Sequence, residues 1–303
     1  MSSAVSPFPL EEEYQKDTGI TPEDIRKLRE WLKTQPHLPA DYITDMDLIL
    51  AYRSCDRSYE VSKQLLDLNF TLKTLFTDFF KDRKVDHRID AALKSILVTP
   101  LPSRTNDGYG VLYATFMNSD WKSFLLPDII KTVIMVIDIW QYEEGSWPGF
   151  IILFDLKNMS LGHLTKLDLN SVRHYLYYLQ EALLANLRGV HYLNAPAYMD
   201  KLMSIVRPFM SNSLLNVLYV HQPESATLQP YFPSEELPKE SGGNFKSVHV
   251  LKDEILSKLY ASSAFFEEEN KKRVTESLRP DKPKTISDFF GSVEGTFKKL
   301  EFD

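Results

Sequence analysis

Three residues with the side chains of a hydrolytic triad lie close together in this sequence: Asp155, Ser160 and His163. In such a triad the serine attacks the substrate, the histidine takes its proton and the carboxylate orients the histidine. In α/β-hydrolases the serine stands on a strained turn with the pattern Gly-x-Ser-x-Gly, which occurs nowhere in the chain. We therefore expect ordinary polar residues of a turn here and keep a serine hydrolase as an alternative.

Other familiar catalytic and ligand-binding patterns are missing as well. The seven histidines include no pair at the i, i+4 spacing of a metal-binding helix, and the glycine patterns of the Rossmann fold and the P-loop are absent. The single cysteine, Cys55, excludes an intrachain disulfide, and we expect it to pack as a small apolar side chain. We interpret His191 as a hydrogen-bonded core residue. The sequence thus predicts no catalytic residue, no metal and no cofactor.

Large apolar side chains are the feature that remains. The chain has 18 Phe, 15 Tyr, 4 Trp and 8 Met, many of them between residues 130 and 210. Such residues fill a protein core, but they also line pockets for lipophilic ligands, which are mostly apolar and aromatic with few polar groups. Composition alone leaves both interpretations open.

The hydrophobic pattern indicates the elements that position these residues. Residues 1–92 show apolar side chains at helical spacing, with a helix start at Thr21-Pro22, and we expect an N-terminal helical domain. Residues 93–250 alternate short strand-like runs, such as 149–156, with helical stretches, which predicts an α/β domain with a mainly parallel sheet. Residues 251–303 are expected to form a C-terminal helix and a tail.

The tail is amphipathic, and we expect it to pack on the body of the protein, with a membrane or a partner as alternatives. Its apolar residues fall on one helical face. They are Ile286, Phe289, Phe290, Val293, Phe297 and Leu300.

Charge and hydropathy exclude several classes of protein. With 35 basic and 42 acidic residues the net charge is −7, which argues against general nucleic-acid binding. The apolar fraction of 43% is that of a globular protein rather than a disordered one. No apolar run reaches membrane-spanning length, and the first residues lack the pattern of a signal peptide. We expect a cytoplasmic protein that binds no nucleic acid.

Several short motifs follow one another in a recognisable order. They lie at 52–55, 71–75, 107–111, 149–156 with 160–163, 187–196, 207–210, 237–243 and 295–300. In this order the chain resembles the CRAL-TRIO (Sec14-like) lipid-binding family, most closely its arthropod members similar to α-tocopherol transfer protein and cellular retinaldehyde-binding protein. The resemblance covers nearly all of residues 20–303.

The resemblance implies a helical N-terminal domain on an α/β domain with a deep hydrophobic pocket, closed by a gate helix at about 197–210. It implies a protein that is not an enzyme, that binds a tocopherol, retinoid or carotenoid and that transfers this ligand between membranes. It also implies a monomer that associates transiently with membranes. A membrane-associated lipid sensor or adaptor is the alternative. Carried over by position, the pocket residues are Phe150, Ile152, Phe154, Leu179, Leu183, Val190 and Met199. The gate residues are Tyr198, Leu202, Met203, Val206 and Phe209.

The resemblance also implies a basic surface for phosphoinositide headgroups, which this chain carries only in part. Arg188 matches one member of the family's basic cluster, but Asn186 stands where a lysine is expected. Phosphoinositide binding depends on charge-assisted bonds from such residues. We therefore expect weak phosphoinositide dependence, with ordinary ion pairing as the alternative role. The membrane-contact candidates are Arg53, Arg57, Arg188 and Arg207.

Overall fold

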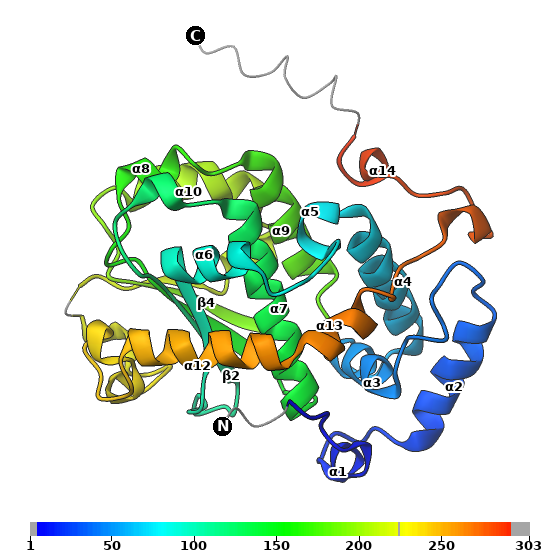
Figure 1. Ribbon diagram of the computed structural model, residues 1–303. Coiled ribbons are helices and arrows are strands. Elements are labelled where there is room, and N and C mark those ends of the chain that lie inside the picture. The colour runs from blue at the N-terminus through cyan, green and yellow to red at the C-terminus, as the bar shows by residue number, and fades with distance from the viewer. Residues whose placement is uncertain (1–4, 224, 292–303) are drawn as a thin grey trace.

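The computed structural model describes residues 5–223 and 225–291 (Figure 1). In these residues five strands form one sheet, in the order β1-β2-β3-β4-β5. The strands are β1 (Ile96–Leu101), β2 (Gly110–Phe116), β3 (Phe150–Asp155), β4 (Leu187–Leu193) and β5 (Leu218–Val220). The first pair is antiparallel and the other three are parallel, so the prediction of a mainly parallel sheet is confirmed.

The chain before the sheet is helical, as the sequence predicts. Its helices are α1 (Leu10–Gln15), α2 (Pro22–Lys33), α3 (Asp45–Ser54), α4 (Tyr59–Leu75), α5 (Thr77–Phe80) and α6 (His87–Ser95). Helix α2 begins where expected, because Thr21 and Asp24 form a reciprocal capping box that satisfies two free backbone N–H groups. Its apolar side Ile25, Leu28 and Leu32 is buried against α3.

The remaining helices surround the sheet. They are α7 (Leu126–Glu144), α8 (Leu161–Leu164), α9 (Leu169–Glu181), α10 (Met199–Val206), α11 (Asn212–Leu215), α12 (Val248–Ala261), α13 (Ser263–Glu269) and α14 (Ile286–Phe290). Figure 1 shows α8 and α10 close together on one side of the molecule and α13 between the sheet and the N-terminal helices.

The strand register divides the sheet into two faces. One face, which we call the α8 face, carries Leu112, Ala114, Ile152, Phe154, Val190 and Tyr192. It is turned toward α8, because the ring of Phe116, next on this face of β2, lies 4.7 Å from the ring of His163. The segment after β5 covers the other face, where the hydroxyl of Ser241 lies 2.6 Å from that of Tyr113.

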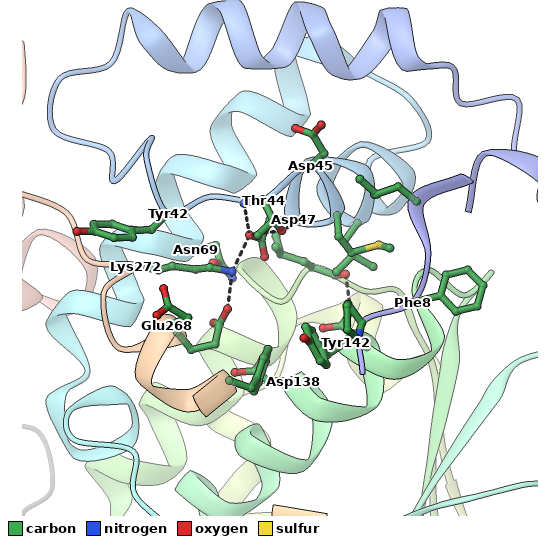
Figure 2. A pocket seen from close by; sticks show the side chains of 18 of the residues that line it. Phe8, Tyr42, Thr44, Asp45, Asp47, Asn69, Asp138, Tyr142, Glu268 and Lys272 are labelled. Atoms are coloured by element: carbon green, nitrogen blue, oxygen red, sulfur yellow. Dashed lines mark hydrogen bonds and ion pairs between the residues drawn. The ribbon is translucent and has the colours of Figure 1, made fainter. Parts of the chain in front are cut away.

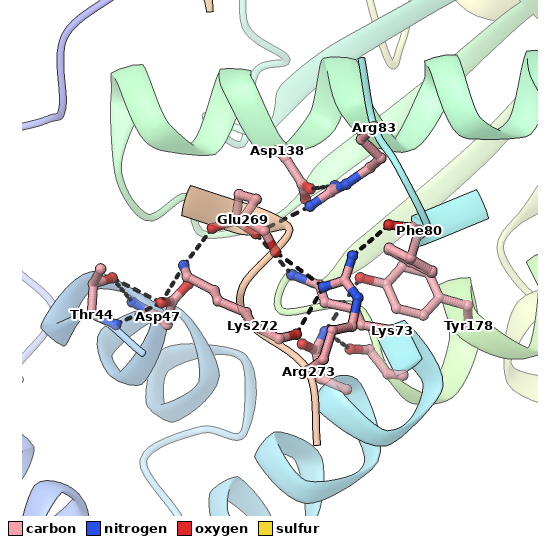
Figure 3. A network of polar contacts seen from close by, with 12 residues as sticks. Thr44, Asp47, Lys73, Phe80, Arg83, Asp138, Tyr178, Glu269, Lys272 and Arg273 are labelled. Carbon is pink, nitrogen blue, oxygen red and sulfur yellow. Dashed lines mark hydrogen bonds and ion pairs between the residues drawn. The ribbon is translucent and has the colours of Figure 1, made fainter. Parts of the chain in front are cut away.

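A buried ionic cluster joins the end of α13 to the rest of the protein (Figure 3). Glu269 is 5% exposed and lies 3.4 Å from both Lys73 and Arg83, and it also pairs with Lys272. Burial on its own would raise the pKa of Glu269, but these three positive charges outweigh it and lower the pKa. The carboxylate is therefore ionised in the folded protein at neutral pH.

The same cluster extends to two further helices. Arg83 pairs with Asp138 of α7, and Lys272 donates to Asp47 of α3 over 2.7 Å. The segment that follows α13 thus binds the N-terminal helices to the helices that flank the sheet. Glu269, Arg83 and Lys272 each have at least two charged partners, so a substitution at one of these three residues affects contacts between several segments.

Candidate functional site

Strand β3, at the centre of the sheet, shows uneven burial on its two faces. On the α8 face Ile152 and Phe154 are only half-buried, whereas Ile151 and Leu153 on the other face are 3% and 0% exposed. A strand in the middle of a sheet that is covered on both faces buries both sets of side chains. The accessible surface on Ile152 and Phe154 therefore indicates unfilled space beside the α8 face.

Two tyrosines border the same space. Burial raises the pKa of Tyr192 on β4 to about 12. Burial also raises the pKa of Tyr175 on α9, and both tyrosines pack against the main hydrophobic core. Both side chains nevertheless keep accessible surface. We call the region bordered by the accessible side chains of Ile152, Phe154, Tyr175 and Tyr192 the sheet hollow.

The pocket residues implied by the family resemblance include neither tyrosine. Tyr192 could have been found by alternation, because it lies two residues after Val190 and next to Phe154 in the register. The ring centroids of Tyr192 and Phe154 are 6.2 Å apart. Neither Tyr175 nor Tyr192 forms a side-chain hydrogen bond with a residue that the structure describes, so the sheet hollow contains two hydroxyls available to a ligand.

Helix α10 presents an apolar side to the protein and a polar side to solvent. Met199, Leu202 and Val206 are 8%, 7% and 9% exposed, and they recur at helical spacing. Met203 is half-buried, while Asp200 is exposed. The expected gate residues on this helix thus lie mainly on its inner side.

Both ends of the expected gate are attached by hydrogen bonds. At the start, the hydroxyl of Tyr198 donates to the carbonyl oxygen of Met159. At the end, Nε2 of Gln180 on α9 donates to the carbonyl oxygen of Phe209 over 3.1 Å. Oε1 of the same Gln180 accepts from the backbone N–H of Ser211, just beyond this segment, over 2.7 Å. Each such hydrogen bond is worth about 1 kcal/mol. Side-chain hydrogen bonds thus hold both ends of the segment.

The C-terminal helix α14 lies near the end of the expected gate segment. The guanidinium of Arg173 is 5.7 Å from the ring centroid of Phe209 and 5.6 Å from that of Phe290. Phe290 also stacks near His174 and Phe76, with centroid distances of 5.0 and 6.1 Å. The described part of the amphipathic tail thus packs on the protein body. Val293, Phe297 and Leu300 lie outside the described residues.

The other predicted pocket residues are distributed over the core. Phe150, Leu179 and Val190 are buried, at 0%, 6% and 8% exposure. Leu183 lines a different space, a cavity of about 870 Å³ between α3 and α13, which we call the α3–α13 cavity (Figure 2). The structure thus brings Ile152 and Phe154 together at the sheet hollow and places Leu183 elsewhere.

The four candidate arginines do not form one cluster of equivalent residues. Arg53 is half-buried and donates to the hydroxyl of Ser146 over 2.8 Å, which makes it a contact between the N-terminal helices and the segment before β3. Burial lowers its pKa. Arg57, Arg188 and Arg207 are exposed and form no ion pair with the residues that the structure describes. These three remain open to a membrane surface.

The triad residues serve a structural role. Nδ1 of His163 accepts bonds from the backbone N–H of Ser160 at 3.0 Å and from its hydroxyl at 2.9 Å, which caps α8. Asp155 instead accepts from Asn194 over 2.9 Å and from the hydroxyl of Ser241. The carboxylate therefore does not orient the histidine, and the three side chains do not form a proton-transfer chain.

The histidines offer no metal site within the described ranges. His191 is 1% exposed, and its Nδ1 lies 3.0 Å from Nε2 of His221, as expected for a hydrogen-bonded core histidine. Burial and the neighbouring His221 lower the pKa of His191 to about 4. Across residues 5–223 and 225–291, no group of three or more His, Cys, Asp or Glu is arranged to hold a metal ion. No helix of this part of the chain is long and apolar enough to cross a membrane.

Comparison with known proteins identifies the two main parts of the chain. The family model "CRAL/TRIO domain" matches residues 95–243, and the model "Pinta-like, UBA domain" matches residues 18–89. Clavesin-1 of Pongo abelii is 26% identical over 254 residues, which cover 80% of this chain and 70% of that protein. Clavesin-2 of Mus musculus is 25% identical over 248 residues, covering 80% and 76%.

A solved structure, "Crystal structure of Sfh5", aligns with a TM-score of 0.46 and 11% sequence identity over 76% of this chain and 91% of that chain. The matched CRAL/TRIO residues contain all five strands and both tyrosines of the sheet hollow. The predicted resemblance to the CRAL-TRIO family is confirmed by the match of residues 95–243 to the CRAL/TRIO domain model, while the similarity to arthropod members stays a prediction.

Proposed function

We propose that the chain binds one lipophilic molecule in the sheet hollow and transfers it between membranes without catalysing a reaction. The observation that supports this most is the accessible surface of Ile152, Phe154 and Tyr192 in the middle of the sheet. A ligand that buries about 400 Å² of apolar surface there gains roughly 10 kcal/mol before ordering costs. That gain is sufficient for tight binding in water.

The ligand is a molecule with a long apolar body and one polar end. The apolar part packs on Ile152 and Phe154, and the polar end bonds with the hydroxyls of Tyr175 and Tyr192. Tocopherols and retinoids have this form, and carotenoids that carry oxygen have it as well. A ligand without a polar group leaves both hydroxyls without partners, which disfavours its binding.

Helix α10 is the gate in this proposal. When it moves outward, Met199, Leu202 and Val206 lose their packing, at about 1.5–3 kcal/mol for each side chain exposed to water. This sums to roughly 5–9 kcal/mol, so the gate stays closed in the cytoplasm. At a bilayer the same side chains enter lipid, and the cost of opening largely disappears. Ligand exchange is therefore confined to membrane surfaces.

Membrane contact rests on the exposed arginines Arg57, Arg188 and Arg207, with weak dependence on phosphoinositide. The test is transfer of a fluorescent retinoid between vesicles with and without phosphoinositide. We expect catalytic transfer in both cases, and less than about fivefold stimulation by phosphoinositide, since isolated exposed charge pairs contribute about 1 kcal/mol at most. Strong phosphoinositide selectivity that vanishes in Arg188→Ala contradicts the weak-dependence claim. Stoichiometric binding without transfer favours a lipid sensor or adaptor.

A further inference from the structure

The α3–α13 cavity is separate from the sheet hollow. Its volume of about 870 Å³ is in the range of small-molecule sites, and it lies where the N-terminal helices meet the rest of the chain, a frequent place for such sites. Apolar side chains form much of its wall. They include Met46 and Leu50 of α3, Tyr142 of α7 and Phe265 of α13. None of the four residues that define the sheet hollow lines it.

The segment before α1 forms one wall of the cavity. The backbone N–H of Phe8 donates to the carbonyl oxygen of Tyr142 over 2.7 Å. Further along, Glu13 is 1% exposed and accepts from the backbone N–H of Ser146 over 3.0 Å, while Lys16 pairs with it at 2.7 Å. The cavity is thus a built site, with a wall fixed by specific contacts, rather than a gap at a loose contact.

Two amides at the cavity lack hydrogen-bond donors. Asn69 is 0% exposed, and its Nδ2 donates to the carbonyl oxygen of Ala182 over 2.7 Å, but its Oδ1 has no partner among the described residues. Gln141 likewise donates through Nε2 to the carbonyl oxygen of Leu184 over 2.9 Å, and no described residue donates to its Oε1, which is not among the fully buried atoms. Buried acceptors are nearly always satisfied in native proteins. Oδ1 of Asn69 therefore indicates a ligand that brings a donor.

The charged side chains that line the cavity are mostly negative. The lining contains the carboxylates Glu11, Asp41, Asp45, Asp47, Asp138, Glu268 and Glu269 and the ammonium groups Lys73 and Lys272. The deep carboxylates are neutralised by the ionic cluster of Figure 3. Glu11 and Asp41, however, are exposed and form no ion pair with the described residues. The unmatched groups of the cavity are therefore acceptors and negative charges.

We propose that the α3–α13 cavity binds a second ligand, a small cationic amphiphile with an apolar body and a primary ammonium group. The body packs on Met46, Leu50 and Phe265. The ammonium group supplies the donor that Oδ1 of Asn69 lacks, and the exposed carboxylates Glu11 and Asp41 attract the cation to the cavity. A fatty-acid anion of the same length is excluded, because it adds an acceptor and a negative charge to a site that already has too many of both.

The test compares dodecylammonium with dodecanoate by calorimetric titration, below the concentration at which either forms micelles. We use the wild type, Ala264→Trp, which fills the exposed edge of the cavity, and Ile152→Trp, which fills the sheet hollow. Dodecylammonium is expected to bind the wild type and Ile152→Trp alike and to lose at least tenfold in affinity in Ala264→Trp. Dodecanoate is expected to be insensitive to Ala264→Trp.

A second variant removes charge without adding bulk. Glu11→Gln combined with Asp41→Asn replaces two exposed carboxylates, and we expect dodecylammonium to bind about tenfold more weakly, with less salt dependence. The proposal is overturned if dodecylammonium binding is lost in Ile152→Trp but retained in Ala264→Trp, since the amine then occupies the sheet hollow. It is equally overturned if the wild type shows no saturable amine binding. Neither result affects retinoid binding, which tests the proposed function separately.

Discussion

Replacement of Glu269 by glutamine is expected to destabilise the protein more than any exposed charge replacement. The carboxylate is 5% exposed and has three cationic partners, Lys73, Arg83 and Lys272. Glutamine keeps the shape of the side chain but leaves buried positive charges without their counter-ion. Removing one partner of a buried ion pair lowers the free energy of unfolding by about 3–5 kcal/mol. For a chain of this length that corresponds to a fall in Tm of roughly 5–8 °C.

The neighbouring Glu268 provides a matched control, because it is exposed and pairs only with Lys271, at 2.6 Å, among the described residues. Glu268→Gln is expected to change the free energy of unfolding by less than about 1 kcal/mol. Urea titration followed by tryptophan fluorescence measures both variants at pH 7. An equal fall in the free energy of unfolding in the two variants would refute the reasoning, because burial of the carboxylate would then make no difference to the loss of stability.

The pH dependence supplies an independent check on the same residue. The folded-state pKa of Glu269 lies below its ordinary value of 4.5 because three cations surround it. Its stabilisation is therefore complete above about pH 4.5 and is lost as the pH falls through the folded-state pKa. The difference in stability between wild type and Glu269→Gln is expected to shrink below pH 4.5. A difference that grows on acidification contradicts this assignment.

Three further predictions concern the site. Tyr192→Phe is expected to weaken binding of a retinoid with a polar end about fivefold, with little change for a hydrocarbon of equal length, because one hydrogen bond is worth about 1 kcal/mol; fluorescence titration measures both, and equal losses would contradict the role of the hydroxyl. Phe290→Ala is expected to speed ligand release from the protein severalfold. The reason is that the ring of Phe290 lies 5.6 Å from the guanidinium of Arg173, which also contacts the proposed gate. Release rates measured by stopped flow that do not change would exclude a link between α14 and the gate. Ser160→Ala is expected to lower stability by about 1 kcal/mol through loss of the α8 cap and to leave ester hydrolysis at background; a fall in measurable esterase activity would revive the hydrolase alternative.

Local signals in the sequence are sufficient for much of the fold. Thr21 and Pro22 predict the start of α2 because capping depends on residues within one turn. The apolar run 149–156 predicts the buried strand β3 because a parallel strand is covered on both faces. Alternation within that run also places Ile152 and Phe154 on one face, as the register confirms.

The parts that could not be predicted depend on residues far apart in the chain. Lys73 and Glu269 are 196 positions apart, and nothing in their local sequences marks them as partners. The partial exposure of Tyr175 on α9 and Tyr192 on β4 depends on how helix and sheet pack, which a single sequence does not specify. For the same reason Leu183, which the family resemblance assigns to the lipid pocket, was not expected to line the α3–α13 cavity.

The central claim is that a lipophilic molecule occupies the sheet hollow, and native mass spectrometry of the purified protein tests it most directly. Wild type and the control Leu161→Trp, substituted at a side chain that is 49% exposed, are expected to carry one extractable lipophile per chain. Ile152→Trp, which places an indole in the sheet hollow, is expected to carry none while remaining folded. A wild-type protein that is free of ligand and does not take up retinoid would contradict the account, as would an Ile152→Trp variant that retains the ligand at wild-type occupancy.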